Sequence, residues 1–273
     1  MATETPCVLV RKTFAEEEEV LAIQDYFPLY QYRAEVPKGS LVIGRYSCLP
    51  HYQELVQDLA ILGSRLINSY EEHRYVADMD YYQDLADVTF PTWFRFQDVP
   101  ARLRDHAFVV KGRTNSRKAE WNTKMFAESF KDAVRIGAEL ATDGLIGTQG
   151  VVIREYVPLE TFELSITGLP HTNEWRLFYY KGQRLAYGYY WGNIEDWTPV
   201  KAAQLDFELV GVPFADEVAL RIKDKVSFVV IDIAKTLEGR WVVVELNDGC
   251  QAGLNDTVDA VDLFSNLKRA ITT

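Results

Sequence analysis

The chain has 273 residues, with 29 Lys and Arg against 40 Asp and Glu, which gives a net charge of −11. This length suits one large or two small domains, and an apolar content of 48% provides enough material for an ordinary hydrophobic core. The acidic balance argues against general binding to nucleic acids or anionic membranes, because both require a basic surface. Any polyanion-binding site must therefore gather its positive charge locally.

Several function classes lack their sequence signature. The start of the chain has no apolar signal core, and no run of about 18 apolar residues occurs, so we expect no membrane span. Cys7, Cys48 and Cys250 lie far apart without a CxxC spacing, which predicts reduced thiols in a cytoplasmic protein rather than a zinc site or disulfides. Arg11 and Lys12 follow the first predicted strand where a dehydrogenase would carry GxGxxG, which disfavours NAD binding.

The first third of the chain is predicted to alternate between strands and helices. In chain order the expected elements are strand 8–10, helix 13–24, strand 41–44, helix 50–63, strand 66–67 and helix 69–85. Two of the helices begin with a capping box, Thr13 with Glu16 and Ser69 with Glu72. The alternation predicts a small parallel α/β unit.

After about residue 94 the predicted β segments become longer. A strand at 108–110 leads into a basic loop, and an amphipathic helix should follow to about residue 140. Its expected buried side is Trp121, Met125, Phe130, Val134 and Ile136. The later elements are strands 151–157, 162–167, 175–180 and 183–191, helix 218–225, strands 228–233 and 241–246, and helix 256–269. We expect the strands between 162 and 191 to form an antiparallel meander, and the last two strands to form a hairpin.

Positive charge is concentrated in one part of the chain. Residues 101–140 carry a net charge of +4, and the remaining residues carry −15. The densest segment begins at Lys111, ends at Lys118 and contains Arg113 and Arg117. Basic side chains and free backbone N–H groups bind phosphate chains, so this segment is a candidate phosphate loop. The alternative is a solvated basic loop ahead of a helix.

A second candidate site lies on the two C-terminal β segments. Asp232 interrupts an apolar run, and Glu245 and Asn247 lie two residues apart on the next strand, so both point to one face. If the strands are neighbours, three oxygen ligands converge in a set that suits Mg²⁺. The alternative is a polar turn after a buried strand, although burying an unpaired carboxylate is costly.

A third feature is Arg176, which begins a predicted strand after a turn. An arginine there is able to stabilise charge that develops during phosphoryl or acyl transfer, although the pattern is also common on protein surfaces. The aromatic run around it permits base or carbohydrate stacking, but its alternation along strands is more typical of packing. These residues are Tyr179, Tyr180, Tyr187, Tyr189, Tyr190, Trp191 and Trp197.

From about residue 65 to 255, the order of these segments resembles the ATP-grasp superfamily. Leu66–Ser69 and Phe90–Thr92 are similar to the entry into the ATP-binding part of that fold. Phe108–Lys111 resembles the strand whose lysine contacts ATP phosphates, and Val151–Val157 resembles the hinge strand beside the adenine.

The C-terminal motifs continue the resemblance. Glu174–Gly182 is similar to the E-x-R strand of the family, whose arginine acts in catalysis, and this makes Arg176 the candidate catalytic residue. Asp232, Glu245 and Asn247 look like its magnesium ligands. Two departures stand out. Many members carry an earlier ATP-binding lysine near positions 78–80, where this chain has none, and the phosphate loop contains one glycine only.

The resemblance implies an α/β (α+β) ATP-grasp fold. A parallel α/β N-terminal domain, 1–94, would precede an ATP-grasp domain, 95–273, whose subdomains of about 95–155 and 156–273 sandwich ATP. The implied cofactors are ATP and Mg²⁺. The implied nucleotide contacts are Lys111, Arg113, Arg117, Lys118, Glu155, Tyr156, Val157 and Glu163, with Glu160 as the alternative ribose contact.

The implied activity is an ATP-dependent carboxylate–amine ligase that works through an acyl phosphate. Its partners would be ATP, a small-molecule or peptide carboxylate and an amine, and many family members are homodimers. One alternative is a non-catalytic nucleotide-binding protein, and another is an ATP-grasp enzyme that modifies RNA or peptide ends. We expect one cleft to be lined by Lys111, Arg176, Asp232, Glu245 and Asn247. No protein nucleophile is required, and we interpret the scattered histidines as surface or structural residues; they are His51, His73, His106 and His171.

Overall fold

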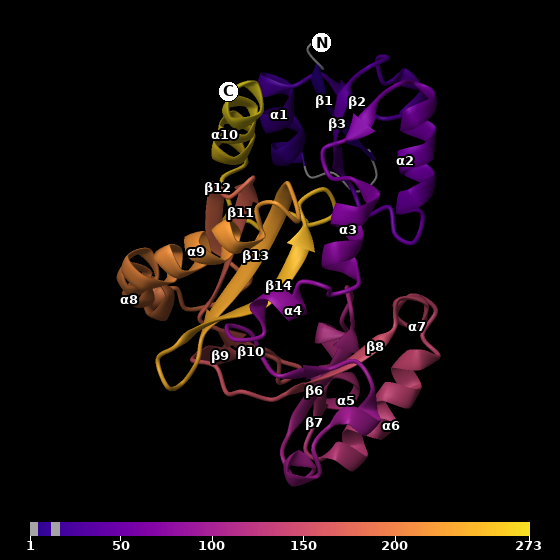
Figure 1. Ribbon diagram of the computed structural model, residues 1–273. Coiled ribbons are helices and arrows are strands. Elements are labelled where there is room, and N and C mark those ends of the chain that lie inside the picture. The colour runs from indigo at the N-terminus through magenta and orange to yellow at the C-terminus, as the bar shows by residue number, and fades with distance from the viewer. Residues whose placement is uncertain (1–4, 12–16) are drawn as a thin grey trace.

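Figure 1 shows the computed structural model of the chain, in which residues 5–11 and 17–273 are described. The strands are β1 (Pro6–Val10), β2 (Leu29–Tyr30), β3 (Leu41–Arg45), β4 (Arg65–Leu66), β5 (Thr92–Trp93), β6 (Phe108–Gly112), β7 (Phe126–Ala127), β8 (Val151–Glu155), β9 (Thr161–Leu164), β10 (Pro170–Thr172), β11 (Glu174–Tyr180), β12 (Gln183–Tyr189), β13 (Phe228–Lys235) and β14 (Trp241–Asp248). The helices are α1 (Glu17–Tyr26), α2 (Tyr52–Ile61), α3 (Tyr70–Ala77), α4 (Tyr82–Leu85), α5 (Trp121–Lys124), α6 (Phe130–Ala141), α7 (Ile146–Gln149), α8 (Thr198–Asp206), α9 (Val212–Ile222) and α10 (Ala260–Thr272).

The N-terminal sheet has the order β2-β1-β3-β4, and every pairing in it is parallel, as expected for an α/β unit. Both β1 and β3 are buried along their whole length, which fits strands covered on both faces. The capping box at the start of α3 is confirmed: Ser69 Oγ accepts from Glu72 N at 3.1 Å, and the Glu72 carboxylate accepts from Ser69 N at 2.6 Å. The capping box predicted at Thr13 lies outside the described residues.

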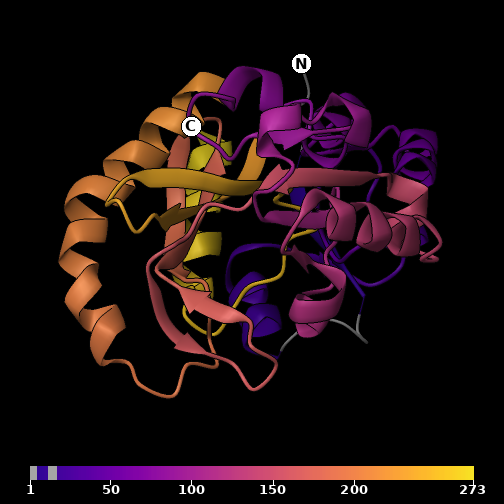
Figure 2. The ribbon, with the colours of Figure 1, turned by 90° about the horizontal axis from the view of Figure 1, so that it is seen from below.

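Two antiparallel sheets follow, with the orders β5-β8-β6-β7 and β12-β11-β13-β14. The predicted hairpin is confirmed: β13 pairs with β14, and the connecting turn contains Gly239 at a φ of 85°. The sheets meet where Thr89, just before β5, forms a bridge with Val243 of β14. The helix α6 packs against β6 and β8, while α9 packs against β12 and β13 (Figure 2). A core therefore lies behind each sheet, and the facing side chains are left to form a site.

The helix predicted after the basic loop is wrong in its first half. Instead of one helix to residue 140, the chain forms the single turn α5, the short strand β7 and then α6. The strand β7 forms because Phe126 pairs with Val109 of β6, a contact that helical periodicity cannot reveal. Ser129 then caps α6 by accepting from Asp132 N at 3.3 Å. Of the expected buried side, Val134 is 44% exposed.

Other predicted elements differ in extent. The helix expected over 69–85 breaks at Met79, whose φ is 59°, into α3 and α4. The helix expected over 218–225 is the end of a longer one, because a π-helical segment, Phe207–Gly211, joins α8 to α9 (Figure 2). The predicted meander is split, since β9 pairs with β10 in a separate two-stranded sheet.

The C-terminal helix returns to the N-terminal unit, and Figure 1 shows α10 beside α1. One hydrophobic cluster joins Ile23 of α1 and Ile43 of β3 to Phe178, Phe228 and Phe264 from β11, β13 and α10. The N-terminal sheet thus shares a core with the C-terminal sheet. None of the helices in the described residues is long and apolar enough to cross a membrane.

Candidate active site

A pocket of about 830 Å³, here called the main pocket, lies between the two antiparallel sheets. That volume is in the range of pockets that hold small molecules and cofactors. Part of its wall is apolar, formed by Phe90, Val109, Trp121, Met125, Leu159 and Leu169. Ionisable side chains gather in the same pocket, namely Lys111, Lys118, Arg154, Glu155, Glu174 and Glu245.

Lys111 and Glu245 form an ion pair across the main pocket. Lys111 projects from β6 and is 5% exposed, and its Nζ donates to Glu245 Oε2 on β14. Burial disfavours the ionised carboxylate, but the charges of Lys111 and Lys118 outweigh it and lower the pKa of Glu245. The pair is therefore charged, and it joins the two sheets at the pocket.

The ion pair continues into a line of charges across three strands. In register, Arg176 of β11 lies opposite Asp232 of β13, which lies opposite Glu245 of β14. We call Lys111, Glu245, Asp232 and Arg176 the charged row. Arg176 donates to both oxygens of Asp232, through Nε at 2.9 Å and Nη2 at 2.8 Å, and Asn247 Nδ2 also donates to Asp232 at 3.1 Å. This bidentate geometry is the strong form of an arginine–carboxylate pair.

The sequence predicted that five residues would line one cleft, and the structure brings these residues together in two layers. Lys111 and Glu245 line the main pocket, whereas Arg176, Asp232 and Asn247 adjoin it through the charged row. Among residues 5–11 and 17–273, no cluster of three or more His, Cys, Asp or Glu side chains is arranged to hold a metal. The oxygen donors here are two carboxylates and one amide.

The predicted phosphate loop divides into pocket-lining and anchoring residues. Lys118 lines the main pocket, where its Nζ bonds the Tyr190 hydroxyl at 2.5 Å and lies 4.1 Å from that ring's centre. Arg117 instead pairs with Asp143, and Arg113 lies over the Phe94 ring at 5.4 Å. Both arginines therefore hold the loop in place.

Arg154 is a pocket residue that the sequence reasoning missed. It is 4% exposed and donates to Thr92 Oγ1 at 3.0 Å, Thr89 Oγ1 at 2.9 Å and the Val244 carbonyl at 2.6 Å. Burial lowers its pKa, and no carboxylate pairs with it among the described residues. With Lys111 and Lys118 it makes three basic groups in one pocket. Its position on the strongly β-forming segment 151–157, between buried valines and isoleucine, was the available signal.

The expected adenine contacts line the other end of the main pocket. Glu155, Tyr156 and Val157 are all lining residues. The two candidate ribose contacts are engaged elsewhere: Glu163 accepts from His171 Nδ1 at 3.1 Å, and Glu160 accepts from Asn173 Nδ2 at 2.9 Å.

Glu174 is the acidic side chain that reaches this part of the pocket, and the sequence reasoning gave it no role. It is 4% exposed, its Oε2 accepts from Thr172 Oγ1 at 3.2 Å, and its Oε1 has no partner among the described residues. Burial raises the pKa of Glu174 to about 7. Its place two residues before Arg176 puts both side chains on one face of β11, which was the signal that could have found it.

The chain matches a family model described as an "ATP-grasp domain", clade family 3, over residues 101–267. This match covers more than half of the chain, and the protein therefore belongs to the ATP-grasp family. Membership confirms the resemblance, the fold class and the expected enzyme class, an ATP-dependent carboxylate–amine ligase. A search of curated protein sequences gave no match.

Solved structures show the same fold. D-cycloserine synthetase DcsG aligns with a TM-score of 0.59 at 16% identity, covering 97% of this chain and 99% of that chain. D-alanyl-alanine synthetase A from Vibrio cholerae O1 biovar eltor str. N16961 gives 0.56 at 12%, covering 100% and 98%. The ATP-grasp ligase PsnB, complexed with precursor peptide PsnA2 and AMPPNP, gives 0.54 at 11%, covering 99% and 98%.

Proposed function

We propose that the protein binds Mg²⁺-ATP in the main pocket and activates a substrate carboxylate as an acyl phosphate, which an amine then attacks. The observation that supports this most directly is the charged row, which runs from a pocket with three basic groups to Arg176. Phosphoryl transfer depends mainly on positioning and on charge stabilisation, which such a row supplies.

The nucleotide would lie with its base near Tyr156 and Val157 and its phosphates toward Lys111 and Lys118. The apolar wall suits a purine, and the basic groups suit the phosphates. Glu174, which lines the same pocket and has an oxygen without a partner, is our candidate for a ribose hydroxyl contact in place of Glu163.

Asp232, Glu245 and Asn247 fit a magnesium ion, because they offer hard oxygen donors from neighbouring strands. A bound Mg²⁺ would neutralise charge on the phosphates. In the structure these carboxylates are paired with Arg176 and Lys111. We propose that Lys111 leaves Glu245 for the phosphates when the nucleotide binds.

The reaction then needs two displacements. A substrate carboxylate oxygen bonds to the γ-phosphorus as ADP leaves, and an amine nitrogen then bonds to the acyl carbon as phosphate leaves. Arg176, at the end of the charged row and 12% exposed, would stabilise the oxyanion of the second step.

The substrates are proposed as a class. PsnB was solved with a precursor peptide, and D-alanyl-alanine synthetase A is named for an amino-acid product. We therefore propose an amino acid or peptide carboxylate, with a primary amine as acceptor, for an enzyme that acts in the cytoplasm. The domain division after residue 94 also remains a proposal, which the shared core of α1, β11 and α10 qualifies.

Hydroxylamine trapping tests this function. The enzyme is incubated with ATP, Mg²⁺, hydroxylamine and each of the twenty amino acids, and both ADP and hydroxamate are measured. We expect equal amounts of the two products with at least one amino acid and none without Mg²⁺. Nucleotide binding without ADP release for any donor, including a peptide library, would instead indicate a non-catalytic nucleotide-binding protein.

A further inference from the structure

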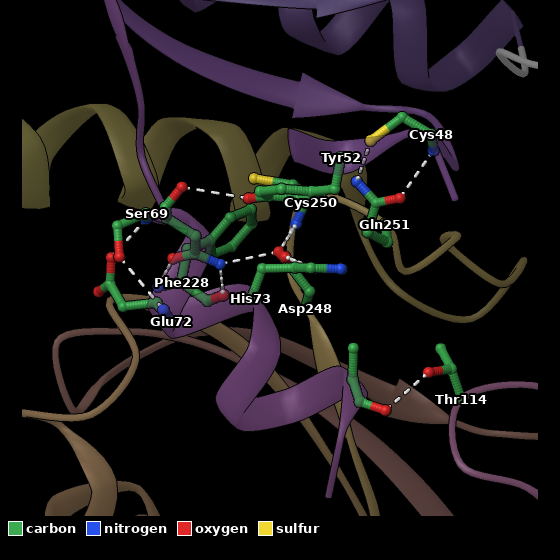
Figure 3. Close-up of polar contacts among 12 residues, drawn as sticks. Cys48, Tyr52, Ser69, Glu72, His73, Thr114, Phe228, Asp248, Cys250 and Gln251 are labelled. Carbon is green, nitrogen blue, oxygen red and sulfur yellow. Dashed lines mark hydrogen bonds and ion pairs between the residues drawn. The ribbon is translucent and has the colours of Figure 1, made fainter. Parts of the chain in front are cut away.

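A histidine–carboxylate pair lies outside the main pocket, where α3 meets the end of β14. His73 Nδ1 lies 2.8 Å from Asp248 Oδ2, and the two side chains are 5% and 3% exposed (Figure 3). Asp248 also accepts from Asn68 Nδ2 at 2.7 Å and from Cys250 N at 2.8 Å. A carboxylate facing Nδ1 makes this nitrogen the donor, so Nε2 of the neutral ring is an acceptor.

The ring of His73 is held in one orientation. It stacks on Tyr52 of α2, with centroids 3.7 Å apart and planes 8° from parallel. Tyr52 is itself fixed, because its hydroxyl donates to the Asn68 carbonyl at 3.1 Å. One nitrogen is therefore anchored, one face is covered, and the direction of the second nitrogen is set by the fold.

That second nitrogen is open. His73 Nε2 has no hydrogen-bond partner among the described residues, and it is not among the unpartnered polar atoms that are sealed from solvent. Figure 3 shows it pointing away from Asp248, on the side of Gln251 and Thr114. A buried histidine with a purely structural role would be expected to use both nitrogens or to hide the second.

The open nitrogen lies beside the machinery of the proposed reaction. His73 and Ala77 are four residues apart and share a face of α3, and the Ala77 carbonyl accepts from Thr114 in the phosphate loop at 3.1 Å. Asp248 directly follows Asn247, the last residue of the proposed magnesium set. His73 thus lies between the phosphate loop and the strand end that carries the charged row.

We propose that His73 is the general base for the amine, with Asp248 as its positioning residue. An alkylamine is protonated at neutral pH and lacks the lone pair that the acyl carbon needs. His73 Nε2 takes one proton from the attacking nitrogen as the C–N bond forms and the acyl–phosphate bond breaks, while phosphate leaves with the bonding electrons. Asp248 holds the imidazolium through Nδ1–H.

This inference rests on the proposed function, and one experiment separates the two. Hydroxylamine is largely neutral at pH 7 and needs no base, whereas methylamine, of similar size, does. The donor amino acid found by hydroxamate formation is tested with each nucleophile in wild type and in His73→Asn. In His73→Asn the amide takes the place of Nδ1 and keeps the donor to Asp248 but lacks Nε2.

We expect His73→Asn to form hydroxamate at the wild-type rate and to lose about 10²-fold or more with methylamine, the usual size of a general-base effect. The exposed His51→Asn should match wild type with both nucleophiles. Equal losses with both would assign His73 a structural role and overturn the proposal, as would a full methylamine rate in His73→Asn or a wild type that uses hydroxylamine alone. Absence of hydroxamate in wild type would instead overturn the proposed function.

Discussion

At the scale of single residues, the site depends on buried charges that neutralise one another. Asp232 is fully buried and carries two hydrogen bonds from Arg176 and one from Asn247. Glu245 is held by Lys111. Removing one member of such a pair leaves its partner buried without compensation, which is costly. Conservative changes that keep shape and hydrogen bonding are therefore the most informative.

Glu245→Gln tests the charged row at its pocket end. The amide keeps the size of the side chain but removes the charge that Lys111 and Mg²⁺ would share. We expect ADP formation to fall by at least 10²-fold, or about 2.7 kcal/mol of barrier, measured at saturating Mg²⁺. The matched change Glu238→Gln, in an exposed turn, should retain wild-type activity. Full turnover in Glu245→Gln would remove this residue from the site.

Glu174 predicts a pH dependence of stability. Its folded-state pKa of about 7 lies above the ordinary 4.5, so folding takes up a proton. The stabilisation is complete below about pH 4.5 and is lost as the pH rises through 7. Glu174→Gln, which mimics the protonated acid, should exceed wild type in unfolding free energy by up to about 3 kcal/mol at pH 8 and match it at pH 4.5. Urea titrations at both pH values measure this, and an unchanged difference would contradict it.

At the scale of elements, α3 connects the N-terminal unit to the site. It begins at the Ser69 capping box and carries His73, and Glu72 also accepts hydrogen bonds from Ser227 N at 2.8 Å and Oγ at 2.6 Å. The helix has eight residues and is too short to form on its own. Its cap and its contacts with β14 therefore fix where His73 lies.

Ser69→Ala should cost about 1 kcal/mol of unfolding free energy, because Glu72 N loses its acceptor. Ser69→Asp keeps a capping oxygen and should remain within about 0.5 kcal/mol of wild type. Urea denaturation of the two variants makes the comparison. Equal stability of Ser69→Ala and wild type would show that tertiary contacts alone hold α3.

Elements with local signals were predictable from the sequence. The Ser69 capping box, the parallel β1–β3–β4 unit and the β13–β14 hairpin all depend on residues close together in the chain. The strand β7 was not predictable, because it depends on pairing with β6. In the site, Lys111 and Glu245 were found by type and order, whereas Arg154 and Glu174 become pocket residues only through non-local packing.

At the scale of the whole molecule, the N-terminal unit and the C-terminal helix are joined through one core. Phe264 of α10 is fully buried, and its ring lies 6.5 Å from that of Phe27, which follows α1. The same cluster contains Phe178 and Phe228 of the sheet that carries Asp232. Loosening α10 should therefore affect the N-terminal unit and the site together.

Phe264→Ala should destabilise the protein by about 3–5 kcal/mol through a cavity in this shared core. We expect one cooperative transition in circular dichroism and in ATP-analogue binding, at a lower urea concentration than wild type. Two separated transitions would show that the N-terminal unit and the ATP-grasp part unfold independently. The exposed Leu237→Ala serves as control and should change stability by less than about 0.5 kcal/mol.

The central claim is that the main pocket and the charged row form the Mg²⁺-ATP site. A crystal structure with a non-hydrolysable ATP analogue and Mg²⁺ tests it most directly. We predict phosphates beside Lys111 and Lys118, a metal ion bound by Glu245 and Asp232, and a Lys111 Nζ that has left the Glu245 carboxylate for the phosphates. A nucleotide bound outside the main pocket, or one bound inside it with the Lys111–Glu245 pair intact and no metal at Glu245, would contradict it.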